Sequence, residues 1–349
     1  MKKTIPALLI LLVCAFLLLT SCSRPDGNVQ DPETSGGPAD TSSQSPPPEP
    51  VTRTEPVVSG DYAYTLENSL ATITSYTGSA AELTIPETLD GFPVVAIGRM
   101  AFANHEEIVR LTVPGCVTRI GDFAFYHCGS LVSVALGDGV QTIGRSSFNA
   151  CRSLAEVSHT GSLDTVDEIA FQGCGALTEF DLEGVRFIGL RAFANSGLTS
   201  LKIPGSVKYL DNAAFLGCED LASAEISAEI SYLPDYLFAY CSSLQSVLLP
   251  ETLNILGEYS FYRCTALETL RLPAVCYRLK DFSLFGCTSL QTIFLLYDGS
   301  FRIQEDALEF LPALKTIYYA GSSDTMAGWQ IESSNYALGA AEIVYGFAG

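Results

Sequence analysis

Cysteine and histidine are the side chains of this sequence whose types and spacing could carry chemistry. Its 349 residues include eleven cysteines and three histidines. Cys14 and Cys22 stand near the N-terminus, and seven of the remaining nine cysteines recur in a single register. These seven, separated by 23 residues or, once, by 44, are Cys128, Cys151, Cys174, Cys218, Cys241, Cys264 and Cys287. Such a column could form disulfides, ligate a metal ion or consist of buried thiols.

The spacing of this column favours buried thiols. Parallel strands stack about 4.8 Å apart, whereas a disulfide needs Cβ atoms about 3.8 Å apart with a specific twist. The CxxC spacing of zinc modules is absent from the sequence. We therefore predict free thiols that pack as small hydrophobic groups, with a disulfide or a metal site as the alternatives.

The histidines offer little catalytic chemistry. His105 occupies the slot in which later repeats carry cysteine, so a metal pair with Cys128 is conceivable, but two ligands do not make a site. We expect His105 and His159 to be packed, hydrogen-bonded residues, and His127 to be exposed. The sequence has no H-E-x-x-H, G-x-S-x-G or P-loop motif. We therefore expect neither an enzyme nor a bound cofactor.

An internal repeat positions these residues. The segment from Leu131 to Ser153 has apolar residues at its first, fourth and sixth positions, and Phe148 and Cys151 near its end. The pattern returns at a shift of 23 residues, and a fixed period in the twenties is the signature of a leucine-rich repeat solenoid. The repeats start, with steps of 23 except for one of 21 and one of 24, at Ile108, Leu131, Leu154, Leu177, Leu198, Leu221, Leu244, Leu267, Leu290 and Leu314.

Each repeat predicts three short elements. Its opening segment alternates with the period of a β-strand, a second extended piece follows, and the last third is too short for more than one or two helical turns. We therefore expect a right-handed β/α superhelix with a parallel strand ladder, short second strands and short helical turns. One aromatic residue fills each repeat, and Leu284 replaces it near the end of the column Phe102, Phe125, Phe148, Phe171, Phe193, Phe215, Phe238 and Phe261.

The flanking regions indicate export. Residues 1–21 combine two lysines with a long apolar run, as in a secretory signal peptide, and an uncleaved membrane anchor is the alternative. The Leu-Thr-Ser-Cys sequence at 19–22 resembles the bacterial lipobox, which implies that lipid is attached to Cys22. Residues 22–60 are rich in Pro, Ser and Thr and predict a disordered linker. We expect an N-terminal β-hairpin cap over 61–82, about eleven repeats over 83–317 and a C-terminal cap over 318–349.

The repeat resembles the BspA-like leucine-rich repeat family. The shared pattern is L-x-x-L-x-[LIV]-P, then V-x-x-I-G, then A-F-x-x-C, and Leu198–Cys218 matches it nearly throughout. The resemblance covers roughly residues 83–320. It implies a secreted or surface-attached bacterial protein that adheres to host matrix proteins or to other cells, without implying one ligand. Together with Cys22, it predicts a lipoprotein anchored at the bacterial cell surface.

The charge of the chain excludes some partners. Lys and Arg total 19 against 39 Asp and Glu, so the formal net charge is −20. Nucleic acid binding requires clustered Lys and Arg, which the sequence lacks. An anionic membrane surface would repel the chain, so we expect membrane attachment only through lipid on Cys22.

The outward positions of the opening strands form the candidate binding surface. Acidic residues gather in the middle of the series, and larger groups gather towards its C-terminal end, where Arg with aromatic residues is typical of interface anchors. We expect this surface to bind a protein partner, with glycan or nutrient capture, or a purely structural surface role, as alternatives. Tyr209 and Tyr232 are expected to form a second, lateral pair. The candidate ligand-binding residues are Glu156, Glu179, Asp181, Glu225, Leu248, Arg271, Phe294 and Tyr318.

Overall fold

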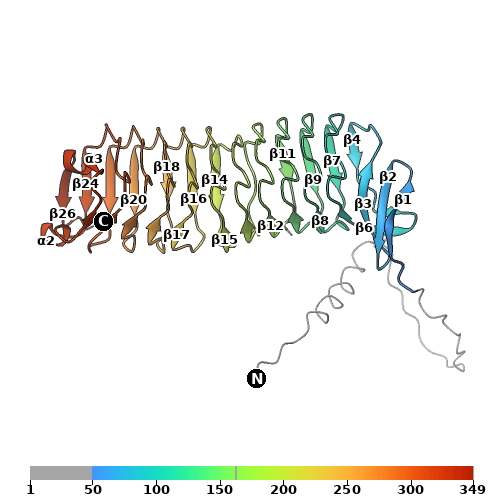
Figure 1. Cartoon of the computed structure of the whole chain (residues 1–349), viewed down its shortest axis with the longest axis horizontal. Helices are drawn as coiled ribbons and strands as arrows, with labels where there is room; N and C mark the ends of the chain where they lie inside the picture. Colours follow the sequence, from blue (N-terminus) through green and yellow to red (C-terminus); the bar gives the residue numbers. More distant parts are fainter. Residues whose placement is uncertain (1–48, 162, 349) are drawn as a thin grey trace, which may run out of the picture.

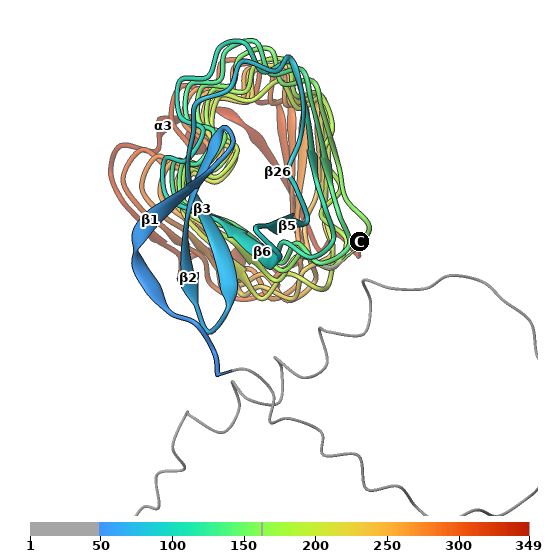
Figure 2. The ribbon, with the colours of Figure 1, turned by 90° about the vertical axis from the view of Figure 1, so that its right-hand side faces the viewer.

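The computed structural model describes residues 49–161 and 163–348 of the chain. Its coils stack into a long rod, with the N-terminal hairpins at one end and the C-terminal tail at the other (Figure 1). Seen along the rod, the coils superimpose around a common interior (Figure 2). The predicted leader, lipidation site Cys22 and most of the predicted linker lie outside the described residues. Within the described ranges, no helix has the length and apolar character needed to cross a bilayer.

The opening strands of the coils form one ladder, which is parallel throughout and divided into three sheets. Apolar and polar residues alternate along each strand, so one side faces the interior and the other, here called the strand face, faces solvent. In Ser200–Ile203, for example, Leu201 and Ile203 are buried whereas Ser200 and Lys202 are exposed. The ladder contains β4 (Glu82–Thr84), β7 (Arg110–Val113), β9 (Ser133–Leu136) and β11 (Glu156–Ser158); β14 (Ser200–Ile203), β16 (Ser223–Ile226) and β18 (Ser246–Leu248); and β20 (Thr269–Leu272), β22 (Thr292–Leu295), β24 (Thr316–Tyr319) and β26 (Glu342–Tyr345).

The second strands form another ladder in two sheets, and each inter-coil pair is parallel. A Cβ atom on Gly144, which follows one of these strands, would lie 2.7 Å from the carbonyl oxygen of Ile120, which explains the glycine of the repeat pattern. The first sheet contains β1 (Arg53–Ser59), β2 (Tyr62–Glu67), β3 (Leu70–Tyr76), β5 (Thr88–Leu89), β6 (Phe92–Ile97), β8 (Arg119–Ile120), β10 (Thr142–Ile143), β12 (Thr165–Val166), β13 (Phe187–Ile188) and β15 (Tyr209–Leu210). The second contains β17 (Tyr232–Leu233), β19 (Ile255–Leu256), β21 (Arg278–Leu279), β23 (Arg302–Ile303) and β25 (Gln330–Ile331).

At each end of the rod, the structure differs from the predicted domain organisation. The linker was predicted to extend to residue 60, but Arg53–Ser59 is a strand, β1, that pairs antiparallel with β2. The tail was expected to seal the last coil, but it adds a further coil, because β25 and β26 pair in parallel with β23 and β24. The described helices, α2 (Ser323–Met326) and α3 (Tyr336–Ala340), both lie in this tail.

The last third of each repeat is not helical, in contrast to the prediction. In each coil, the residues two positions before and two positions after the core slot have positive φ, and most of them are not glycine. Phe123 (φ 57°) and His127 (φ 59°) are examples. Alternate amides then bond in different directions: Tyr126 N donates to Phe123 O within the coil, whereas Phe125 N donates to Ser147 O of the next coil. Because alternate amides donate their hydrogen bonds to the next coil, the i to i−4 hydrogen-bond pattern of an α-helix cannot form.

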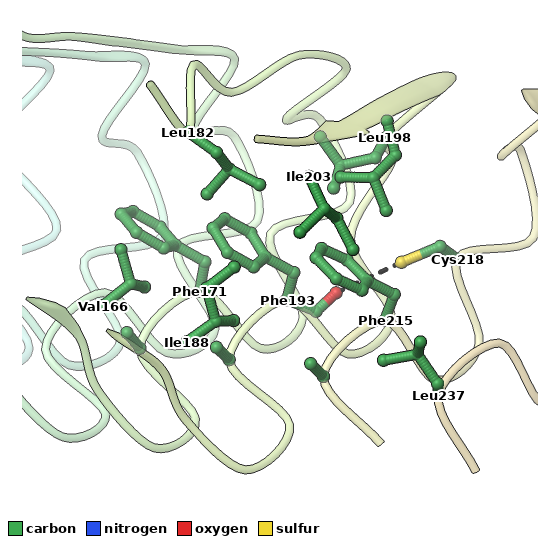
Figure 3. Packing of buried hydrophobic residues seen from close by; sticks show 14 of the residues in the cluster. Val166, Phe171, Leu182, Ile188, Phe193, Leu198, Ile203, Phe215, Cys218 and Leu237 are labelled. Carbon is green, nitrogen blue, oxygen red and sulfur yellow. Dashed lines mark hydrogen bonds between the residues drawn. The ribbon is translucent and has the colours of Figure 1, made fainter. Parts of the chain in front are cut away.

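The phenylalanine column is confirmed. Consecutive rings from Phe102 to Phe261 are stacked, with centroid separations between 5.0 and 6.1 Å, and all of these side chains are fully buried. Phe171, Phe193 and Phe215 show the arrangement in Figure 3. Fully burying one such side chain stabilises the folded chain by about 1.5–3 kcal/mol. The column therefore forms the continuous core that single coils lack.

The cysteine column consists of free, buried thiols, as predicted. The prediction missed that each thiol also donates a hydrogen bond to the carbonyl oxygen of the core phenylalanine in the preceding coil, at 3.1–3.3 Å. The bond from Cys218 to Phe193 O is drawn in Figure 3. Burial raises the pKa of the Cys218 thiol to about 11 and that of the Cys174 thiol to about 12. These thiols are therefore uncharged structural donors that join adjacent coils.

His105 occupies the first position of this column and acts in the same way. Its Nε2 lies 3.1 Å from Tyr76 O of the preceding coil, and its Nδ1 lies 2.5 Å from Glu107 Oε1. Both ring nitrogens are thus engaged in hydrogen bonds. Within residues 49–161 and 163–348, no group of three or more His, Cys, Asp and Glu side chains is arranged to hold a metal ion.

Candidate functional site

The predicted ligand-binding residues all project from the strand face, where the structure arranges them in two groups joined by a row of paired positions. Glu156, Glu179 and Asp181 line one hollow, and Arg271, Phe294 and Tyr318 lie together near the C-terminal end. Between the groups, Lys202, Glu225 and Leu248 occupy matching positions on the paired strands β14, β16 and β18. Leu248 is 63% exposed, so an apolar side chain stands in the middle of this face.

The first group surrounds a break in the strand ladder. The coil that begins at Leu177 is the 21-residue repeat, and its segment 178–182 does not form a strand, so β11 and β14 belong to different sheets. Phe180 occupies its inward position, with ring centroids 5.1 Å from Phe171 and 5.0 Å from Phe193. A shortened coil with this large ring cannot keep the register of its neighbours, and the face is hollowed there.

His159 bridges the coils at this break. Its Nε2 donates to the carbonyl oxygen of Asp181 at 2.7 Å, and its ring centroid lies 5.7 Å from that of Phe180. The side chain therefore supplies an inter-coil hydrogen bond where the strand is missing. The prediction that His159 is hydrogen-bonded is confirmed, although the residue is only partly buried.

The hollow, here called the acidic notch, has a volume of about 420 Å³. Phe180 forms part of its wall, and Glu156, Glu179, Asp181 and Glu183 bring four carboxylates to it against the one cation of Lys202. Such a cluster attracts positively charged groups, and low-dielectric walls strengthen that attraction. The predicted ligand-binding residues include three of these carboxylates but not Phe180 or Lys202. The sequence did not indicate that the strand ladder breaks at the shortened coil.

The second group is an aromatic cluster on the sheet β20-β22-β24-β26. Phe294 and Tyr318 stack with centroids 4.9 Å apart, and the Arg271 guanidinium lies 5.9 Å from the centroid of the Phe294 ring. Phe347 contacts both rings, at 5.3 Å from Phe294 and 5.1 Å from Tyr318. The sequence did not reveal Phe347, because it lies outside the repeats.

The C-terminal tail holds Phe347 in this position by backbone bonds. Gly346 N donates to Gly321 O at 3.0 Å, and Phe347 N donates to Tyr319 O at 3.2 Å. A second hollow of about 500 Å³ lies beside the cluster, where the four strands end, and Asp298 is the one charged residue among its lining side chains. The cluster thus combines a cation and three aromatic rings with an adjacent hollow.

A further aromatic surface, which the prediction missed, lies on the turns of the C-terminal coils. Tyr236 and Tyr259 stack at 4.6 Å, and Tyr259 and Phe282 stack at 4.7 Å. The signal was present in the sequence, because these three residues recur 23 residues apart. We call this surface the aromatic flank, and it consists of Tyr236, Tyr240, Tyr259, Tyr262, Phe282, Phe285 and Phe310.

The expected pair of Tyr209 and Tyr232 is not formed. The Tyr209 ring contacts Phe187 at 6.2 Å, while the Tyr232 hydroxyl donates to Asp235 and its ring lies beneath the Lys280 ammonium at 5.5 Å. Burial, with the hydrogen bond to Asp235, raises the pKa of Tyr232 to about 12. The pair fails because β15 and β17 lie in different sheets, so the two coils are not paired there.

Stacked parallel coils with an apolar column inside and an open strand face define a leucine-rich repeat solenoid. The model of the BspA type leucine rich repeat region matches residues 95–222 and 209–335, with six copies. The chain belongs to this family.

Several solved structures are similar to the chain. A leucine-rich cell surface protein of Faecalibacterium prausnitzii is 23% identical, and the likeness covers 84% of this chain and 100% of that one with a TM-score of 0.44. The leucine-rich repeat protein of T. pallidum is 28% identical over 61% of this chain and 91% of its own, with a TM-score of 0.47. One from Bacteroides ovatus is 20% identical over 83% and 99%, with a TM-score of 0.40. A search of the curated proteins finds no match.

Proposed function

We propose that this chain is a bacterial surface lipoprotein, anchored through lipid on Cys22, whose strand face binds a protein partner without covalent chemistry. The partner class is a host matrix protein or the surface of another cell. The residues 61–82 shield the first coil as a cap in this proposal, since a solenoid needs an end that covers its core. The observation that carries the proposal is the composition of the strand face.

The strand face combines two features that suit a protein partner. Arg271, Phe294, Tyr318 and Phe347 form a cluster of the residue types that dominate protein interfaces. The acidic notch adds a charged contact that would favour a basic region of the partner and accelerate its association. Backbone and thiol hydrogen bonds join each coil to the next, so the surface is rigid before binding. This rigidity lowers the conformational entropy lost on association.

The binding test uses the purified full-length chain on immobilised matrix proteins and intact cells. Replacing Tyr318 or Phe294 by Ala should weaken retention by roughly thirtyfold, which corresponds to about 2 kcal/mol for an interface anchor. Tyr336→Ala is the matched control, because Tyr336 is 73% exposed and lies on α3, away from the strand face. Failure of the unmodified chain to be retained by any protein or cell would refute the proposal.

The acidic notch allows an independent test. Asp181 Oδ1 accepts a hydrogen bond from Glu183 N at 2.9 Å, so Asp181→Asn keeps an acceptor while it removes the charge. We expect slower association that no longer depends as strongly on ionic strength. Glu251→Gln, a change of an exposed residue in a turn, is the control. Lipid attachment is tested separately. Cys22→Ser should release the chain from the membrane fraction, and mass spectrometry should find acyl groups only on the chain that keeps Cys22.

A further inference from the structure

A third hollow lies on the other ladder, at the point where the sheet of second strands ends. Its volume is about 400 Å³, within the range of small-molecule sites, roughly 300–1,000 Å³. It is lined by residues of β12, β13 and β15 and their flanks. The strand β15 pairs with β13 on one side only, since β17 of the next coil belongs to a different sheet. Tyr209, on this last strand, is therefore not covered by the next coil and is 68% exposed.

The Tyr209 ring differs from the exposed rings of the aromatic flank. In the aromatic flank, rings such as Tyr236 and Tyr259 are nearly parallel, at 4.6 Å and 5°, so neighbouring rings cover each other's faces. In the described part of the chain, the one ring in contact with Tyr209 is Phe187, at 6.2 Å and inclined by 45°. Phe187 thus supports the Tyr209 ring from one side and leaves a face open to a ligand.

The polar groups around this ring are balanced in charge. Asp164 forms an ion pair with Arg186, and Asp167 and Lys208 contribute one further charge of each sign. Asp167 Oδ1 accepts from Glu168 N at 2.7 Å, and its second oxygen has no hydrogen-bond partner in the described chain. Lys208 Nζ donates to Gly205 O at 3.1 Å and retains further N–H donors. The site therefore offers both a free acceptor and free donors without net charge, although the chain as a whole carries −20.

We propose that this hollow, the Tyr209 site, binds a neutral saccharide. The apolar C–H face of a pyranose ring packs on the open face of Tyr209, and its hydroxyl groups, each both donor and acceptor, bond to the Asp167 carboxylate and the Lys208 ammonium. The ion pair of Asp164 with Arg186 closes one wall, and the opposite charges of Asp167 and Lys208 leave the site without a net charge that would favour an ionic ligand. This site is on a different ladder from the strand face, so it does not depend on the function proposed above.

The test is an array of neutral and acidic oligosaccharides probed with the purified full-length chain, followed by calorimetric titration of a retained sugar. Tyr209→Ala should weaken binding about tenfold through loss of the aromatic contact. Tyr209→Phe, which keeps the ring, should bind nearly as well as the unmodified chain. Tyr336→Ala is the control, because it removes a similarly exposed ring from another element.

Three results would overturn the proposal. They are the absence of any retained neutral sugar, equal binding by the Tyr209→Ala variant, and a preference for sialylated or sulfated sugars over neutral ones. Because Tyr209 is exposed, the variants should keep the thermal melting point of the unmodified chain, which shows that lost binding is not lost folding. Binding to matrix proteins should be unchanged in Tyr209→Ala, so failure of this site and failure of the strand face are distinguishable.

Discussion

Removal of one core ring should cost more where more rings surround it. Phe193 is fully buried and contacts three rings, with centroids 5.4 Å from Phe171, 5.5 Å from Phe215 and 5.0 Å from Phe180. Phe261 is equally buried, but the one ring in contact with it in the described chain is Phe238, at 5.7 Å. The two sites therefore differ in aromatic contacts and not in burial.

The magnitude follows from these contacts. Truncation of a buried Phe to Ala costs about 3–5 kcal/mol, and each aromatic pair contributes about 0.5–1.5 kcal/mol beyond the buried area. We expect Phe193→Ala near the upper end of that range and Phe261→Ala about 1 kcal/mol or more below it. Phe193→Leu should cost less than Phe193→Ala, because it leaves a smaller cavity and because Leu284 already fills the same slot in another coil.

The assay is urea unfolding followed by circular dichroism. Repeat arrays can lose cooperativity, so the slope of each transition must match that of the unmodified chain before midpoints are converted to free energies. Equal losses for Phe193→Ala and Phe261→Ala would refute the role assigned to ring stacking. A loss below about 2 kcal/mol for Phe193→Ala would contradict the continuous column itself.

Three further outcomes are expected. In the folded chain at pH 8, iodoacetamide should leave the seven column thiols unmodified, because burial raises their pKa, whereas partly exposed Cys116 should react; urea should make all of them reactive, and peptide mass spectrometry distinguishes the two states. Asp90 accepts hydrogen bonds from Ser59 Oγ at 2.7 Å and Tyr64 Oη at 2.8 Å, which lower its pKa. The stability that this lowered pKa gives is complete above the unfolded pKa of about 3.9 and is lost as pH falls through the lower folded value. Hydrogen-exchange protection factors in β1–β3 should therefore fall in acid, and Asp90→Asn should remove that dependence. Arg191 has φ of 54° and an exposed side chain, so Arg191→Gly should relieve about 1–2 kcal/mol of strain, offset by about 0.5–1 kcal/mol of chain entropy, and should raise the urea midpoint slightly; a lower midpoint would contradict this reasoning.

The core of this protein could be predicted because each core slot repeats. Phe125, Phe148 and Phe171 occupy equivalent positions in successive repeats, so one correct assignment of an inward position applied to the whole column. The thiol column followed in the same way. A local deviation has no such support. The shortened coil around Phe180 and the unpaired edge at Tyr209 could not be predicted, because one repeat's departure does not say how its neighbours adjust.

The candidate binding residues were predicted as positions on a face, and their grouping was not. Strand alternation was sufficient to place Glu179 and Arg271 outside. Whether Glu179 meets a cavity depends on the break in the ladder, and whether Arg271 meets a third ring depends on how the tail returns Phe347 to the sheet.

The sequence by itself determined the period, the solenoid and the identity of the internal columns, because apolar side chains at a fixed spacing can be buried together only when successive repeats stack on one another. The tertiary structure alone decided the path of the turns, the breaks in both ladders and the partners of the thiols. The physical reason is that these features depend on backbone hydrogen bonds between coils, such as Phe125 N to Ser147 O, and each such bond joins residues about one repeat apart. No local pattern of side chains specifies to which of two competing carbonyl groups a backbone amide donates its hydrogen bond.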